Sequence, residues 1–180
     1  GAEFYGYTAD VTRTVPSNGV FSPEQRELYQ IVYDSQEASI NAAEVGNSFR
    51  DLYFLSYDII AEGLMRLGII KEASEAKKYY PHGLSHHIGL DVHDPGNYKL
   101  LAPDMVITIE PGIYIPDGSP CDPKWWNIGI RIEDDVLVTS EGPVNLSAGA
   151  PRKWSEIEAL MREESVLKKF ILPEIETLVK

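Results

Sequence analysis

Apolar residues recur every three or four positions in two stretches of the chain, the spacing that gathers them on one face of a helix. Ser22 and Gln25 form a capping box ahead of the first stretch, and Pro23 suits the first helical position. The pattern therefore predicts two amphipathic helices, at about residues 23–45 and 49–67.

β-Branched and aromatic residues dominate three other stretches and predict strands there. We expect one or two strands in residues 1–15 with a bend at Gly6, a short apolar strand at Met105–Ile109 and a longer one at Ile128–Val138. Residues 79–100 are rich in His, Gly, Asp and Pro, and predict a functional loop.

A third amphipathic helix is predicted near the C-terminus. Ser155 and Glu158 have the spacing of a capping box, and apolar residues follow on one face as far as Phe170. Pro173 is expected to end this helix.

Composition narrows the class of protein. The chain has 180 residues, which suits one domain, and its formal net charge of -12 argues against a nucleic-acid partner. No apolar run approaches the roughly 18 residues of a membrane span, so no membrane partner is expected. Cys121 is the single cysteine, which excludes an internal disulfide and indicates a reducing compartment such as the cytoplasm.

All four histidines lie in the loop, at His82, His86, His87 and His93. A single histidine is more often a structural residue than a ligand, but clustering of the whole set favours a functional role. An acidic chain with clustered histidines suits cation binding, although solubility alone also explains the bulk charge.

Three carboxylates stand in strand-like surroundings. Asp10 follows a β-rich stretch, where a turn or edge position is the alternative, and Glu110 ends an apolar strand, where it could simply begin a turn. Glu133 and Arg131 alternate with isoleucines, so a solvent-facing ion pair is the alternative there. A carboxylate at a buried strand end is costly unless it is paired or coordinates a metal.

Together these residues indicate a metal site. Oxygen and imidazole ligands without sulfur suit Mn²⁺, Co²⁺, Zn²⁺ or Fe²⁺, and bridging carboxylates would hold two ions about 3.5–4 Å apart. Such a pair hydrolyses amides or esters. The sequence has no Gly-rich phosphate loop, nucleophile elbow or HExxH run that would point elsewhere.

Four strings, taken in order, resemble the signatures of the pita-bread metallopeptidases. They are GAEFYGYTADVTRT at 1–14, HGLSHHIGLDVHD at 82–94, EPGIY at 110–114 and GIRIED at 129–134. As a set they resemble the Xaa-Pro aminopeptidase (aminopeptidase P) and prolidase branch of that family.

The resemblance implies a ligand set. Asp10 would bind both metals and His86 one of them. Glu110 would bind that same metal and act as general base for the attacking water, and Glu133 would bridge the two ions. The cofactor is expected to be two divalent ions, commonly Mn²⁺.

The same resemblance implies residues that handle the substrate. His82 and His93 would contact it and stabilise the tetrahedral intermediate or move protons, while Arg131 and Tyr114 would orient it. The expected substrate is a peptide with proline at its second position.

The implied fold is α+β: the pita-bread (creatinase/aminopeptidase-like) fold, with a curved antiparallel sheet and helices on its outer face. Residues 1–162 would form the later part of that catalytic domain, truncated at its N-terminus, and residues 163–180 a C-terminal extension. The family has another Asp ligand two positions before the counterpart of Gly1. We therefore expect this chain to bind metal weakly or not at all, and the fragment alone to be inactive or poorly active.

The expected function is that of a fragment of a dinuclear-metal Xaa-Pro aminopeptidase, which hydrolyses the bond before proline and assembles as a homodimer. Two alternatives share the motifs. One is a prolidase, which cleaves only dipeptides, and the other is a non-catalytic pita-bread binding module.

Overall fold

The computed structural model describes residues 1–165 and 167, and combines helices with antiparallel strands. The strands are β1 (Glu3–Phe4), β2 (Tyr7–Thr8), β3 (Val106–Ile109), β4 (Gly112–Ile115), β5 (Ile128–Arg131), β6 (Asp134–Thr139) and β7 (Gly142–Asn145). The helices are α1 (Pro23–Asn41), α2 (Phe49–Arg66) and α3 (Trp154–Leu160), with 3-10 turns η1 (Ala73–Lys78) and η2 (Pro123–Trp125). The predicted α+β fold is confirmed.

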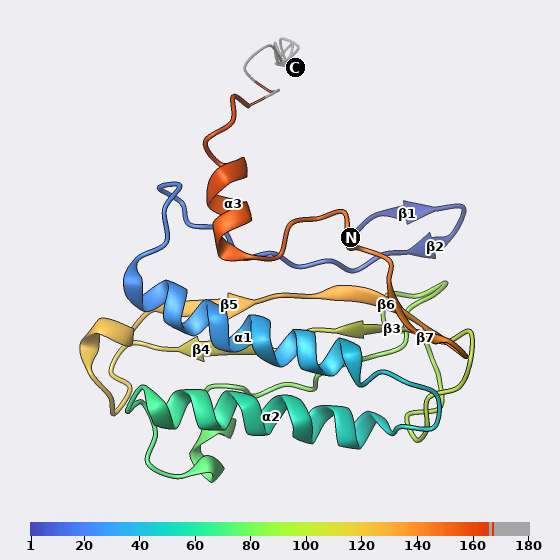
Figure 1. Ribbon diagram of the computed structural model, residues 1–180, viewed down its shortest axis with the longest axis horizontal. Coiled ribbons are helices and arrows are strands. Elements are labelled where there is room, and N and C mark those ends of the chain that lie inside the picture. The colour runs from blue at the N-terminus through green and yellow to red at the C-terminus, as the bar shows by residue number, and fades with distance from the viewer. Residues whose placement is uncertain (166, 168–180) are drawn as a thin grey trace, which may run out of the picture.

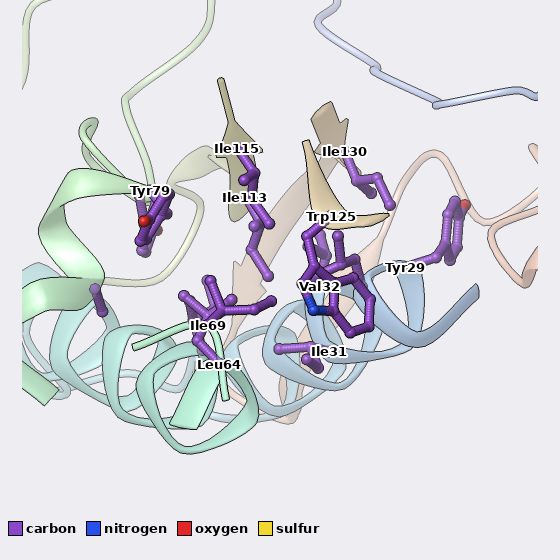
Figure 2. Packing of buried hydrophobic residues seen from close by; sticks show 14 of the residues in the cluster. Tyr29, Ile31, Val32, Leu64, Ile69, Tyr79, Ile113, Ile115, Trp125 and Ile130 are labelled. Carbon is purple, nitrogen blue, oxygen red and sulfur yellow. The ribbon is translucent and has the colours of Figure 1, made fainter. Parts of the chain in front are cut away.

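The two long helices lie side by side and cover one face of the strands (Figure 1). Figure 2 shows Ile113, Ile115 and Ile130 on β4 and β5, packed in one cluster with Val32 of α1 and Leu64 of α2. Each of these side chains is at most 1% exposed. Burial of so much apolar surface holds the helices to this face, which leaves the opposite face of the strands for chemistry.

Both predicted helix starts are confirmed, but α1 ends four residues early. Ser22 and Gln25 form the capping box in the structure. Instead of continuing to residue 45, α1 ends at Asn41, although Ala42 N–H still donates to Ala38 O at 3.0 Å. Gly46 N–H donates to Leu101 O at 2.9 Å, so this linker is tied to the segment before β3.

The stretch Ile128–Val138 forms two strands, and the prediction of a single strand is wrong. β5 pairs with β4, whereas β6 pairs with β3 and β7. The chain changes partners at Ile132 and Glu133, which belong to neither strand. The break places Glu133 where two small sheets meet.

The N-terminal stretch also differs from the prediction of strands through residue 15. β1 and β2 form a short hairpin that turns at Tyr5 and Gly6, whose φ values are 51° and 84°. Residues 9–16 lie in no strand. Thr14 there bonds Arg131 through its side chain, with the hydroxyl donating to Arg131 O and accepting from Arg131 N–H, both at 3.0 Å. The Thr14 hydroxyl thus bonds the backbone of Arg131, where a paired strand would use its own backbone groups.

The C-terminal helix is shorter than predicted and begins differently. Its N-cap is Lys153 rather than Ser155, and it ends at Leu160. Glu158 does not cap this helix. Its carboxylate instead accepts hydrogen bonds from Phe21 N–H and from the Arg26 side chain, both at 2.9 Å. The predicted positions Phe170 and Pro173 lie outside the described residues. Within the described part of the chain, no helix is both long and apolar enough to cross a membrane.

Candidate metal centre

Four predicted ligands converge on the face of the strands away from the helices. One ligand atom from each of Asp10, His86 and Glu133 lies within 4.8 Å of the others. Glu110 joins them through His86, since its Oε1 is 3.3 Å from His86 Nε2. Asp10 Oδ2 lies 3.7 Å from the same nitrogen. The structure therefore brings together residues that are up to 123 positions apart.

β3 sets the spacing between His86 and Glu110. The loop that carries His86 runs beside this strand: Thr108 N–H donates to His86 O at 2.9 Å, and Glu110 N–H donates to Leu84 O at 2.8 Å. The buried Thr108 hydroxyl also accepts from His86 N–H at 3.1 Å. The imidazole and the carboxylate are thus held by one short ladder.

Glu133 is buried near other carboxylates, and the charge of Arg131 offsets only part of the rise in its pKa. Glu133 is only 2% exposed, and the Thr12 hydroxyl donates to its Oε2. Burial raises the pKa of Glu133 to about 7, the bond from Thr12 works against this, and the charges of Glu110 and Asp10 add to the rise. A carboxylate in this setting gains from any cation placed near it.

His86 provides the positive charge in the absence of a metal. Burial lowers its pKa, but the hydrogen bond to Glu110, the bond to His87 O and the charges of Glu110 and Asp10 outweigh burial and raise it to about 9. His86 Nδ1 lies 3.0 Å from His87 O. A proton fixed on Nδ1 leaves the Nε2 lone pair for a metal once the second proton is displaced.

These residues fit a divalent-metal site. Three carboxylates and one imidazole supply oxygen and nitrogen donors, and the imidazole is oriented through its other nitrogen, as in known metal sites. Thr12 orients one oxygen of Glu133 and leaves the other available to an ion. The site has charge, donor type and orienting hydrogen bonds suited to a metal.

The predicted substrate-orienting residues form a second group next to the ligands. His82 Nε2 lies 2.9 Å from the Tyr114 hydroxyl, and His82 Nδ1 lies 2.7 Å from Gly83 O. Burial raises the pKa of Tyr114, while its hydrogen bond to Arg131 lowers it. A Cβ on Gly112 would come within 2.5 Å of the Tyr114 hydroxyl, so glycine is needed there. His82, Tyr114 and Arg131 thus act as one hydrogen-bonded chain.

The histidine cluster divides into different roles. The exposed His93 ring packs edge-on against His86 with centroids 4.5 Å apart, so it lies at the open side of the metal centre. His87 is buried between Phe49 and Tyr98, with ring centroids 5.1 Å and 4.8 Å away. His87 therefore holds the loop in place. The clustering of histidines in the sequence did not distinguish this structural residue from its neighbours.

Several supporting residues were not predicted. Thr12 stands two positions from the candidate ligand Asp10, and Thr108 two positions from the candidate ligand Glu110. Residues two apart share a face in extended chain, so this spacing was a usable signal. Arg13 gave no such signal. Its guanidinium donates to the carbonyls of Thr12, Glu133, Ala150 and Pro151 and to the Asp134 carboxylate, at 2.7–3.0 Å. Arg13 thereby joins three distant segments behind the ligands.

Residues 1–140 match the model of metallopeptidase family M24. The chain belongs to metallopeptidase family M24. This membership implies divalent metal ions and agrees with the ligand geometry. The predicted resemblance and the pita-bread fold are confirmed.

Relatives within the M24 family are similar over most of this chain. An Xaa-Pro aminopeptidase of Escherichia coli (strain K12) is 42% identical over 173 residues, covering 89% of this chain. The zinc-substituted E. coli aminopeptidase P in complex with product has a TM-score of 0.85, 41% identity and 88% coverage. The E. coli enzyme with the inhibitor Pro-Leu has a TM-score of 0.84, 42% identity and 87% coverage.

The chain is shorter than these M24 relatives. It spans 39% of the curated E. coli protein, 40% of the zinc-substituted chain and 38% of the Pro-Leu complex. The family match ends at residue 140, so the expected boundary at residue 162 stays a prediction.

Proposed function

We propose that this chain forms the metal-binding part of an Xaa-Pro aminopeptidase, which releases the first residue of a peptide whose second residue is proline. The observation that carries the proposal is the convergence of Asp10, His86 and Glu133 within 4.8 Å, with Glu110 beside His86. The similarity to Xaa-Pro aminopeptidases over 89% of the chain supports this choice of reaction.

Asp10, His86, Glu110 and Glu133 would hold the metal. When bound, two divalent ions such as Mn²⁺ supply a water of lowered pKa and polarise the scissile carbonyl. Manganese, two ions per chain, a cytoplasmic location and a homodimer are predictions from the sequence.

The chain's own residues have separate tasks in this reaction. Glu110 lies beside His86 with its carboxylate 17% exposed, so it can accept a proton from a nucleophile at the open side of the site. His93 stands at that same side, where it can bind the substrate. His82, backed by Tyr114 and Arg131, donates or accepts a proton at Nε2, and its Nδ1 is fixed on Gly83 O.

The first test is metal content. The chain is incubated with Mn²⁺, desalted and subjected to elemental analysis, beside His86→Ala, Glu133→Gln and the control Glu62→Gln, which removes an exposed helical carboxylate. We expect weakly held metal in the wild type and the control, and much less in the other two. Equal metal in all four proteins would contradict the ligand assignment.

The second test is hydrolysis by the metal-loaded protein. A tripeptide with proline second should be cleaved, the same peptide with alanine second should not, and cleavage of an Xaa-Pro dipeptide alone would indicate a prolidase. Binding without cleavage of any of these would indicate a binding module.

Two variants divide the proposed roles. Glu110→Ala should lower turnover by at least about a thousandfold, because it removes a ligand and the general base together. His93→Ala should lower turnover while metal content stays near that of the wild type. Loss of metal in His93→Ala would make this residue a ligand instead.

A further inference from the structure

A cavity of about 420 Å³ lies between the first two turns of α2 and the loop that carries the histidines. Four aromatic rings form much of its wall, and they belong to Phe49, Tyr53, Phe54 and Tyr98. Phe54 is 46% exposed and Tyr98 is 47% exposed, so the cavity opens to the surface at these two side chains. Its volume falls in the range of small-molecule sites.

Arg50 is the only charged side chain among the residues that line this cavity. Its guanidinium carbon lies 5.3 Å from the centroid of the Phe54 ring, which is itself part of the wall, so the charge lies at the rim of the cavity. The neighbouring acid, Asp51, accepts instead from the Ser48 hydroxyl at 2.7 Å. Among the residues that the structure describes, the guanidinium has no ion-pair partner, so its N–H donors are available to a ligand.

The charge and the walls of the cavity select the kind of ligand. One guanidinium matches one carboxylate, because two parallel N–H groups can donate to its two oxygens. The wall offers no second cation, which a multiply charged phosphate would favour. Aromatic walls hold a flat ring through its face or its edge. A carboxylate joined to an aromatic ring by a short apolar chain therefore suits both the charge and the walls.

We propose that this cavity binds an aryl carboxylate, with the carboxylate at Arg50 and the ring among the four aromatic side chains. Small free acids have this chemistry, and so does the end of a peptide whose last residue is aromatic. Asp10, His86, Glu110 and Glu133 do not line the cavity. Binding of the carboxylate therefore does not depend on the proposed function.

The wall of the cavity also contacts the histidine loop. The rings of Phe49 and Tyr98 pack against His87, with centroids 5.1 Å and 4.8 Å away. The Tyr98 hydroxyl accepts from His87 N–H at 3.3 Å. A ligand that touches these two rings should therefore change the chemical environment of His87, whose NMR signals report that the cavity is occupied.

Carboxylate binding is tested on the chain without added metal. 3-Phenylpropionate and its uncharged counterpart 3-phenyl-1-propanol are titrated into isotopically labelled protein, and NMR chemical shifts give the affinities. We expect the acid to bind with a Kd of about millimolar and to shift the His87 signals, and the alcohol to bind at least about tenfold more weakly. Equal affinity for the two probes, or no binding of the acid, would overturn the proposal.

Variants at exposed positions locate the binding. Arg50→Gln removes the charge and should weaken binding of the acid by at least about tenfold, whereas Arg50→Lys should keep a preference for the acid over the alcohol. Phe54→Ala removes part of the wall and should weaken both probes. Arg66→Gln, which removes an exposed arginine at the other end of α2, should change nothing. Unchanged affinity for the acid in either Arg50→Gln or Phe54→Ala would overturn the proposal.

A further pair of probes separates the two sources of the carboxylate. Acetyl-Ala-Ala-Phe and its carboxy-terminal amide are titrated into the same protein. If the cavity accepts the end of a peptide, the peptide acid should bind at least as tightly as 3-phenylpropionate, and the amide at least about tenfold more weakly. If the cavity accepts only small free acids, the peptide acid should bind at least about tenfold more weakly than 3-phenylpropionate.

Discussion

Asp134 and Asp135 are neighbours on β6 and face opposite sides of it, with opposite surroundings. Asp134 is fully buried on the helix side, where its oxygens lie 2.7 Å from Arg13, 3.0 Å from Gln36 and 3.5 Å from Arg152. Asp135 has one backbone hydrogen bond and an oxygen with no partner among the described residues. The carboxylate of Asp134 is thus paired with donors through both oxygens, whereas that of Asp135, on the other face of β6, is paired through only one.

The difference separates a carboxylate that is fully paired within the fold from the carboxylates that gather at the candidate metal centre. On the open face Glu133 is also nearly fully buried, and three further acidic side chains, Asp10, Glu110 and Asp135, stand around His86. Burial raises the pKa of Asp135, as it does that of Glu133. A cluster of carboxylates around one imidazole, with raised pKa values among them, is typical of functional sites.

The sharpest test of this comparison is Asp134→Asn. The change leaves the largely buried guanidiniums of Arg13 and Arg152 without their shared carboxylate, so we expect a loss of about 3–5 kcal/mol in the free energy of unfolding. Urea denaturation measures it, with Asp58→Asn as the control for loss of one charge. A loss below about 1 kcal/mol would mean that Asp134 does not hold the fold.

A second test uses the pH dependence of the metal-free chain. Between the ordinary Glu133 pKa of 4.5 and its folded value of about 7, the folded state holds a proton that the unfolded state has released, so stability falls as pH rises. The raised pKa of His86, about 9 against 6.5, stabilises the folded state below pH 6.5, and this contribution is lost as pH rises toward 9.

The two contributions therefore have the same sign, and stability should decline from about pH 5 to pH 9. Glu133→Gln should flatten the part of the curve between about pH 5 and 7, and excess Mn²⁺ should reverse the decline because metal competes with protons. Thermal unfolding across this range, with and without Mn²⁺, measures both effects. An identical curve for Glu133→Gln would show that the carboxyl titrates normally.

The smallest expected effect comes from Asp135→Asn. The amide oxygen can keep the bond from Asp10 N–H, and removal of the charge relieves its burial. We expect the free energy of unfolding at pH 8 to change by less than about 1 kcal/mol in urea denaturation. A loss as large as that of Asp134→Asn would end the distinction between the two faces.

The sequence predicted the helices better than the strands because their signals are local. The capping box at Ser22 lies within four residues. The break at Glu133 was missed because Ile130 and Ile132 remain buried on one side across it, so the alternation continues while the strand partner changes. Partner exchange depends on segments far away in the chain, and periodicity does not report it.

The candidate site shows the same division. The residue types that suit a metal were visible as carboxylates and clustered histidines, and the structure brings Asp10, His86 and Glu133 together. The burial of these residues could not be read from the sequence. A solvent-facing ion pair of Arg131 and Glu133 was therefore an alternative, which the structure excludes because Glu133 is only 2% exposed. Apart from the neighbouring Thr12 carbonyl, the partners of Arg13 lie more than 100 residues away, beyond the reach of any local pattern.

The contacts of Arg13 also set an order of events during folding. Its guanidinium bonds Pro151 O, 138 positions away, and Glu133 O, 120 positions away. During synthesis from the N-terminus, the segment that carries Asp10 reaches the ribosome exit long before its partners do. Contacts of such wide sequence separation close late and slow folding. Asp10 thus joins the other candidate ligands only after nearly the whole described chain has been made.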